Sequence, residues 1–291
     1  MKNKIRAFDI LGSVALVKFP AGTPKKDRKK FALNLLKEQK QIKTILEKTG
    51  RFKGRLRKMK TAFLAGENTK EVLYKENGCI FRFNIDKTYF SPRLAGERKE
   101  ISSKIKAGDE VLVMFAGVGP FSVAIAKNSK AKKVYSNELN RDANKYGKLN
   151  IELNKLKGKI ELLPGDIKRV AEKLKKHGKK FDVIVMPRPQ LKDSFLKQAF
   201  NLSKKGTRIY YYDFAKNFPK KNFGATKSWA ASSRRQQKDF IGCKTESTEA
   251  IVNKIKTEAK TAKKKIKILK IKEAGEIAPY KIRIRIDFVI S

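Results

Sequence analysis

The stretch 109–126 constrains the fold of this chain more than any other part of the sequence. It reads Asp-Glu-Val-Leu-Val-Met-Phe-Ala-Gly-Val-Gly-Pro-Phe-Ser-Val-Ala-Ile-Ala, two apolar runs separated by a Gly-x-Gly-Pro sequence. This pattern predicts a buried strand over 111–115, a tight turn at Gly117 and Gly119, and a helix that begins at Pro120. Glycine adopts the positive φ of such a turn and lets a ligand approach the backbone closely. The stretch therefore predicts the first strand, turn and helix of an open parallel α/β sheet.

An acidic residue follows this turn at an informative distance. The run 133–137 predicts the next strand, and Glu138 stands at its end, about twenty residues beyond the glycine turn. A carboxylate at that position of a βαβ unit hydrogen-bonds a ribose. Since the third glycine of the dinucleotide fingerprint is absent and Pro120 stands in the turn, the pattern favours S-adenosylmethionine over NAD. The alternative is an ordinary strand-to-helix turn without a ligand, which the spacing of Glu138 disfavours.

The charge of the chain indicates a polyanionic partner. Lys and Arg number 71 against 28 Asp and Glu, which gives a net charge of +43 spread over 291 residues. Nucleic acid is the simplest partner for such a chain, and a membrane surface is the competing one. No run of eighteen apolar residues and no signal peptide is visible, so we expect a soluble, cytoplasmic protein. The two cysteines, Cys79 and Cys243, are too few for a disulfide framework or a metal site, and we expect no metal.

Two domains are expected. Residues 1–85 predict a small α+β domain, and residues 86–291 an α/β domain with a doubly wound sheet. The first is expected to contain two strands around a turn within 5–19, a helix over 25–48 that Gly50 ends, and strands at 61–64, 71–75 and 79–85. The second is expected to contain strands 111–115, 133–137, 159–163, 181–186 and 207–213, helices 120–128, 141–154, 167–177, 192–203 and 246–260, and terminal strands 266–271 and 280–290.

Several candidate residues fall where predicted parallel strands end, which is where open α/β sheets bind ligands. Asp166 follows the strand 159–163 and could accept a hydrogen bond from an adenine amino group; equally, it could cap the helix that starts at Ile167. In the segment 91–98, Glu97 stands beside Arg98, and the local pattern alone indicates an exposed pair at a helix start. The basic run 51–57 could be a solvated phosphate-binding stripe. Local pattern leaves each of these alternatives open.

Five motifs together resemble the archaeal and eukaryal tRNA (guanine-37-N1)-methyltransferases. They are Asp-Ile-Leu-Gly at 9–12, Leu-Ala-Gly-Glu at 64–67, Phe-Ser-Pro-Arg-Leu-Ala-Gly-Glu-Arg at 90–98, Met-Phe-Ala-Gly-Val-Gly-Pro-Phe at 114–121 and Tyr-Tyr-Asp-Phe at 211–214. The resemblance extends over the chain from Phe8 onward. Archaeal members usually carry a further N-terminal domain that docks on the tRNA elbow. This chain begins where their second domain begins, so we expect that domain to be absent.

The resemblance implies a class I methyltransferase domain with a Rossmann-like sheet, preceded by a small RNA-facing α+β domain. Its implied reaction moves a methyl group from S-adenosylmethionine to N1 of guanosine 37, beside the anticodon of a tRNA. The protein is expected to act as a monomer on the anticodon stem-loop. Transfer to N1 needs an acceptor for the N1 proton and a cation near O6.

The resemblance also implies individual roles. Glu97 would be the general base and Arg57 the cation at O6, with Arg55 too close in sequence to exclude. The implied cofactor-binding residues are Phe115, Gly117, Gly119, Phe121, Glu138, Asp166 and Pro189, and the implied substrate-binding residues are Arg55, Arg93, Arg98 and Arg188.

Two positions depart from the family pattern. Val113 stands where the family often has Asp, which puts one polar contact near the methionine end of the cofactor in doubt. Pro187 replaces the Asn of an Asn-x-Pro segment that helps hold the guanine; Pro189 is kept, and Arg188 is a possible substitute. Two other functions stay open. One is aminocarboxypropyl transfer, or methylation of the tricyclic base of the wyosine pathway, at the same tRNA position; the other is non-catalytic RNA binding.

Overall fold

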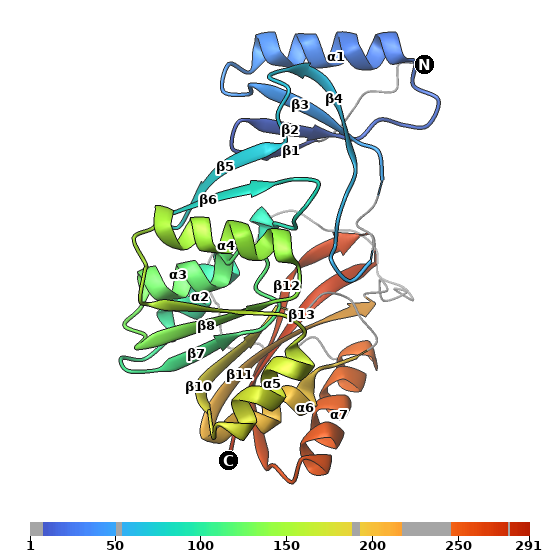
Figure 1. The fold of residues 1–291 in the computed structure, drawn as a ribbon. Coiled ribbons are helices and arrows are strands. Elements are labelled where there is room, and N and C mark those ends of the chain that lie inside the picture. The colour runs from blue at the N-terminus through green and yellow to red at the C-terminus, as the bar shows by residue number, and fades with distance from the viewer. Residues whose placement is uncertain (1–7, 51–53, 188–192, 217–245, 279) are drawn as a thin grey trace, which may run out of the picture.

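The computed structural model describes residues 8–50, 54–187, 193–216, 246–278 and 280–291. Figure 1 shows a large twisted sheet with helices on both faces and, beside one end of it, a smaller layer made of a sheet and one helix. The N-terminal residues build the small layer, and the C-terminal hairpin β12–β13 lies in the large sheet. None of the helices in these described ranges is long and apolar enough to cross a membrane.

The small layer is a four-stranded sheet covered by one helix. Its strands, in the order β1-β2-β3-β4, are β1 (Asp9–Leu11), β2 (Val14–Val17), β3 (Thr44–Lys48) and β4 (Thr61–Gly66). Helix α1 (Lys25–Glu38) packs on it through Ala32 and Leu35, which are buried with apolar residues of the sheet. The two strands expected around a turn within 5–19 are confirmed as β1 and β2.

The helix predicted over 25–48 is wrong in its last part. Helix α1 ends at Glu38, and Thr44–Lys48 forms strand β3 between β2 and β4. Ile45 and Leu46 are fully buried, the first against α1 and the second in the core on the other face of the sheet. Two adjacent apolar residues suit a central strand covered on both faces as well as they suit a helix, so the local pattern misled.

The hairpin of β5 (Glu71–Glu76) and β6 (Cys79–Asn84) joins the small layer to the large sheet. Asn150, in helix α4 (Arg141–Leu153), accepts the Arg82 N–H at 2.7 Å. Asn154, just after that helix, accepts the Ile80 N–H at 2.9 Å. Strand β6 is thus bound to α4, although it lies N-terminal to residue 85. The division of the chain at that residue stays a prediction.

The large sheet has the strand order β12-β13-β11-β10-β7-β8-β9. Strands β7 to β11 are parallel, and the C-terminal hairpin joins them antiparallel through β13. The strands are β7 (Glu110–Val113), β8 (Lys133–Glu138), β9 (Ile160–Pro164), β10 (Phe181–Met186), β11 (Ser203–Lys216), β12 (Ile266–Ala278) and β13 (Lys281–Ile290). The expected doubly wound α/β fold is confirmed.

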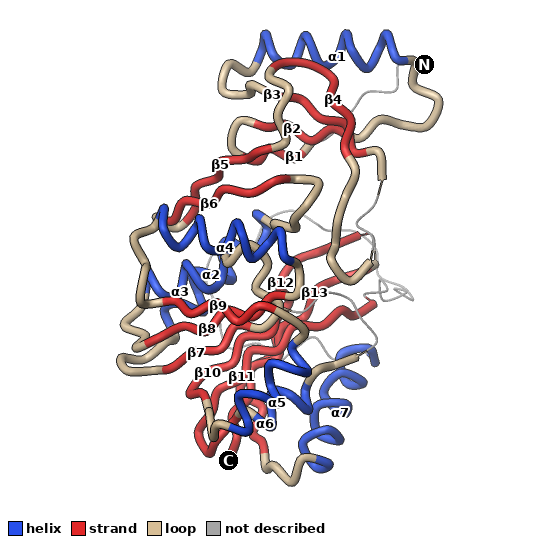
Figure 2. The backbone as a smooth tube through the Cα atoms, viewed as in Figure 1, coloured by secondary structure: helices blue, strands red, loops and turns tan. Residues whose placement is uncertain are grey.

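Helices cover both faces of this sheet (Figures 1 and 2). Helices α2 (Ala95–Ser103), α3 (Pro120–Asn128) and α4 cover one face, and α5 (Ile167–Lys176), α6 (Leu196–Asn201) and α7 (Glu246–Thr261) cover the other. In β7, Val111 and Val113 face the first set and Leu112 the second, as strand geometry requires. Helix α6 is shorter than the predicted 192–203, because the chain takes a left-handed conformation at Phe195 just before it.

Candidate functional site

A pocket lies at the carboxyl ends of the parallel strands, between the large sheet and the loop that joins β3 to β4. It is lined by Arg55, Leu56, Arg57, Tyr89, Leu94, Phe115, Gly117, Asn137, Glu138, Leu139, Asn140, Ala143, Gly165, Asp166, Ile167, Pro187, Phe195 and Arg283. The segments after β7, β8, β9 and β10 all contribute to it, which is the expected place for a ligand in an open α/β sheet.

The glycine turn and Glu138 form one hydrogen-bonded unit. The Gly117 N–H donates to Oε2 of Glu138 at 2.8 Å, and the Asn140 N–H donates to Oε1 at 2.7 Å. Gly117 has φ 60° and Gly119 φ 86°, so both adopt the left-handed conformation that the turn was predicted to need. Burial raises the pKa of Glu138, and the backbone donors oppose that shift. A carboxylate has about four acceptor positions, so Glu138 can still accept hydrogen bonds from a ligand.

Asp166 has two partners. Its Oδ1 accepts the Lys168 N–H at 3.0 Å, so Asp166 is the N-cap of α5, as one of the two predicted readings required. Its Oδ2 accepts a hydrogen bond from the Arg55 guanidinium at 2.8 Å. The Lys168 N–H and then Arg55 hold the pKa of Asp166 below its ordinary value, against the effect of burial. The side chain is therefore an ionised acceptor at the pocket wall.

Three of the seven described non-glycine residues with a positive φ line the pocket. Arg57, Phe115 and Phe195 have positive φ values of 51°, 57° and 59°. Bulky residues rarely adopt this region, and when they do the strain tends to lie at functional sites. Phe115 and Phe195 meet edge to face with ring centroids 4.9 Å apart, which gives the pocket a rigid aromatic wall between β7 and the start of α6.

Among the described residues, three arginines line the pocket. Arg55 and Arg57 come from the loop before β4, and Arg283 comes from β13, more than two hundred residues later in the chain. The Arg57 guanidinium lies over the ring of Tyr89, 3.9 Å from its centroid. Arg283 and Tyr89 were not predicted. The signal for Arg283 was present, since β13 alternates isoleucine with charged residues, and one face of such a strand must carry the charges.

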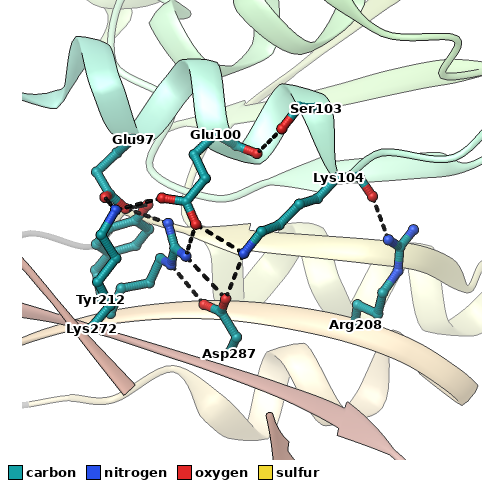
Figure 3. Close-up of polar contacts among 9 residues, drawn as sticks. Glu97, Glu100, Ser103, Lys104, Arg208, Tyr212, Lys272 and Asp287 are labelled. Carbon is teal, nitrogen blue, oxygen red and sulfur yellow. Dashed lines mark hydrogen bonds and ion pairs between the residues drawn. The ribbon is translucent and has the colours of Figure 1, made fainter. Parts of the chain in front are cut away.

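Glu97 lies one helical turn beyond the pocket-lining Leu94 and is buried, with 6% of its surface exposed. Glu97 is not among the described residues that line the pocket. Its carboxylate accepts hydrogen bonds from the Tyr212 hydroxyl at 2.8 Å, the Lys272 ammonium at 2.7 Å and the Arg285 guanidinium at 2.6 Å (Figure 3).

Burial by itself raises the pKa of Glu97, but Lys272, Arg285 and Tyr212 together hold that pKa below its ordinary value. The carboxylate is therefore ionised at neutral pH. The alternative reading, an exposed pair of Glu97 with Arg98, is wrong. Both side chains are buried, and Arg98 pairs with Glu76 of β5 instead.

The remaining predicted residues are scattered. Arg98 is 1% exposed and donates to Glu76 and to the Ser91 carbonyl, which argues against the predicted contact with substrate. Phe121 is buried in the core near Tyr212 and does not line the described pocket, because α3 turns this side chain toward the sheet. Arg93 is exposed and pairs with Asp9 of β1 at 3.3 Å.

Of the two departures from the family pattern, one lies inside strand β7 and the other lines the pocket. Val113 is fully buried in β7, so no polar group replaces the family's Asp at that position. Pro187 lines the pocket, where the family's Asn would stand. Arg188 and Pro189 lie outside the described residues. Among the described residues, no group of three or more His, Cys, Asp or Glu side chains could hold a metal ion.

Comparison with known proteins gives a consistent result. The TRM5/TYW2 methyltransferase domain matches residues 72–237. The tRNA (guanine(37)-N(1))-methyltransferase Trm5b of Pyrococcus abyssi is 35% identical over 208 residues, which are 72% of this chain and 60% of that protein. The tRNA (guanine(37)-N(1))/4-demethylwyosine(37)-methyltransferase Taw22 of Nanoarchaeum equitans is 42% identical over 150 residues, which are 52% of this chain and 49% of that protein.

Solved structures agree in fold. The crystal structure of Pyrococcus abyssi Trm5b superposes with a TM-score of 0.78 at 28% identity, covering 99% of this chain and 76% of that one. The complex of aTrm5 with tRNALeu gives a TM-score of 0.76 at 28% identity, covering 98% and 72%. The match spans only about 60% of the length of the Trm5b sequence. The resemblance seen in the five motifs is confirmed: this chain belongs to the TRM5/TYW2 methyltransferase family.

Proposed function

We propose that this protein is an S-adenosylmethionine-dependent tRNA methyltransferase that methylates N1 of guanosine 37. The observation that carries the proposal is the pocket itself, in which the strand-end carboxylates of Glu138 and Asp166 lie together with Arg55, Arg57 and Arg283. Relatives from Pyrococcus abyssi, Methanocaldococcus jannaschii and Dictyostelium discoideum bear this activity in their names. The net charge of +43 suits a tRNA partner, and a related enzyme has been solved with tRNALeu.

The residues present suit the proposed cofactor. Glu138 and Asp166 are acceptors fit for ribose hydroxyls and an adenine amino group, and the aromatic wall of Phe115 and Phe195 is suited to a planar base. Gly117 has a φ of 60°, which glycine adopts without strain, and its lack of a side chain lets a ligand approach the backbone there. When bound, S-adenosylmethionine supplies an electrophilic methyl group.

For the methyl transfer, we assign Glu97 as acceptor of the guanine N1 proton and Arg57 as the cation near O6. The ionised state of Glu97 suits a base, and its three donors leave about one acceptor position of the carboxylate open. Arg57 lies in the pocket beside Tyr89, where a fixed positive charge stabilises an oxyanion. Arg55, which is engaged by Asp166, is the weaker candidate for that role.

The test is nucleoside mass spectrometry of tRNA incubated with the protein and S-adenosylmethionine. One methyl group on guanosine 37, at N1, is the expected product. Addition of an aminocarboxypropyl group would contradict the proposal, and so would an unchanged nucleoside mass when intact S-adenosylmethionine is present. Cofactor without tRNA is the matched control, and it should yield no S-adenosylhomocysteine.

The name of one relative favours a second activity, methylation of 4-demethylwyosine at position 37. The Taw22 protein, 42% identical over its matched region, is named for both guanosine and 4-demethylwyosine methylation. Pro187 replaces the family's Asn in the pocket and removes a polar side chain beside the base. The same assay on tRNA that carries 4-demethylwyosine at position 37 tests this activity, and an unchanged nucleoside mass excludes it.

A further inference from the structure

Three side chains that contact Glu97 form one row across the large sheet. Tyr212 of β11 pairs in register with Arg285 of β13, and Arg285 pairs in register with Lys272 of β12. Residues opposite each other in antiparallel strands present their side chains on the same face. All three donate to the carboxylate of Glu97, which comes from α2 above the row (Figure 3).

Arg285 is the centre of this row. Its side chain is fully buried, and its guanidinium contacts Glu97 at 2.6 Å, Glu100 at 2.6 Å and Asp287 at 2.7 Å. Lys104 pairs with Glu100 at 3.0 Å and with Asp287 at 3.2 Å, and Lys272 pairs with Glu100 as well as with Glu97. Three carboxylates and three cations therefore balance in a cluster whose centre is buried, while Glu100, Lys104 and Lys272 at its edge are partly exposed.

We propose that Arg285, with Tyr212 and Lys272, is a positioning residue that holds the Glu97 carboxylate in one orientation for proton transfer. This inference rests on the proposed function. It makes the C-terminal hairpin, which lies outside the region matched by the family model, part of the active-site machinery.

Stability alone is a poor reason for such a cluster. Removing charges from water is costly, and buried ion pairs often stabilise a fold no better than apolar side chains of similar size. A planar guanidinium with fixed donor directions does, however, fix the orientation of the carboxylates that it contacts. Arg283, two residues earlier on the same face of β13, lines the pocket, so one strand contacts both the pocket and Glu97.

The arrangement predicts a pH effect with a definite sign. The charged and titratable groups around Glu97 are Tyr212, Lys272 and Arg285, with Glu100, Asp287 and Lys104 behind them. Because the first three stabilise the ionised form, removing any one of them raises the pKa of Glu97. As the pH is lowered, the rate of methyl transfer should therefore begin to fall at a higher pH in each variant than in the wild type.

The experiment measures the single-turnover rate of methyl transfer from about pH 5 to pH 9, with tRNA and cofactor saturating. Tyr212→Phe and Lys272→Gln remove one donor each, and Arg285→Lys keeps the charge but loses the planar contacts. We expect each to shift the low-pH fall in rate upward by about one pH unit or more, with a rate above pH 8 close to that of the wild type and both dissociation constants within about twofold. Arg285→Gln should be worse than Arg285→Lys.

Arg208→Lys is the matched control. Arg208 also projects from β11 and pairs with Asp109, but it contacts Lys104 only through the backbone carbonyl, at 2.5 Å, and does not contact Glu97. Its pH profile should match the wild type. If Arg285→Gln fails to fold, Tyr212→Phe still tests the inference. This substitution removes only one oxygen atom from the core, so the variant should fold.

Three outcomes are decisive. An active wild type and variants whose pH profiles do not shift would overturn the inference while leaving the proposed function intact. An equal loss of rate at every pH, matched by a loss of thermal stability, would mean that the row is structural and would also overturn it. A wild type that transfers no methyl group would refute the proposed function, and the inference with it. Carboxyl NMR titration of Glu97 in wild type and Lys272→Gln gives an independent readout, in which a higher Glu97 pKa in the variant is the expected result.

Discussion

Replacing Glu138 by alanine should affect cofactor binding and local stability separately, and the structure allows both to be estimated. The wild-type carboxylate accepts the N–H groups of Gly117 and Asn140 at 2.8 and 2.7 Å, and we assign it the ribose hydroxyls as well. A hydrogen bond to a charged group contributes about 1.5–3 kcal/mol, so the alanine variant should bind S-adenosylhomocysteine about 10- to 150-fold more weakly. Each N–H that loses its acceptor costs about 1–3 kcal/mol when buried, and less where water from the pocket replaces the carboxylate.

The assay is isothermal titration with S-adenosylhomocysteine, with urea unfolding followed in parallel. Glu138→Gln should lie between wild type and alanine, because its amide oxygen can still accept one of the two N–H groups. Asp142→Ala is the control: Asp142 stands in the first turn of α4, pairs with Lys58 at 3.1 Å and does not line the pocket. An alanine variant at Glu138 with wild-type affinity and normal folding would refute the assignment of this carboxylate to the cofactor.

Three further predictions concern the base, the tRNA and the ionic cluster. Glu97→Gln should lower the single-turnover rate at least about a hundredfold while tRNA and cofactor affinities stay within a fewfold; a wild-type rate would remove Glu97 from the mechanism. The affinity for tRNA should fall steeply with salt, since many Lys and Arg displace counterions from phosphates. A plot of log binding constant against log salt concentration should have a slope of about −4 or steeper, and a nearly flat plot would contradict a phosphate-dominated interface. Arg285, Lys272 and Lys104 outweigh burial and hold the pKa of Glu100 well below its ordinary 4.5, so this group stabilises the fold above pH 4.5 and loses that effect as the pH falls further. Glu100→Gln should accordingly be less stable than wild type in urea at pH 7 and closer to it near pH 3, whereas an equal difference at both pH values would contradict this account.

Much of the site could be predicted from short segments of sequence. The Gly-x-Gly turn and Glu138 are local features of consecutive βα units, and parallel strands bring their carboxyl ends to one edge of the sheet. Asp166 was placed at that edge for the same reason, and its role as helix cap follows from its position before Ile167. The helix expected through residue 48 was wrong because a central strand buried on both faces shows no alternation.

The partners of Glu97 could not be predicted in this way. Tyr212, Lys272 and Arg285 lie 115, 175 and 188 residues further along the chain. No local pattern encodes that distance. Only the pairing of β13 between β11 and β12 aligns the three donors beneath α2. The sequence thus determined the sheet, the turn and the carboxylates at strand ends, because these depend on residues close in the chain. The tertiary structure alone decided that Glu97 is buried and held in place, because strand order and register bring distant charges together.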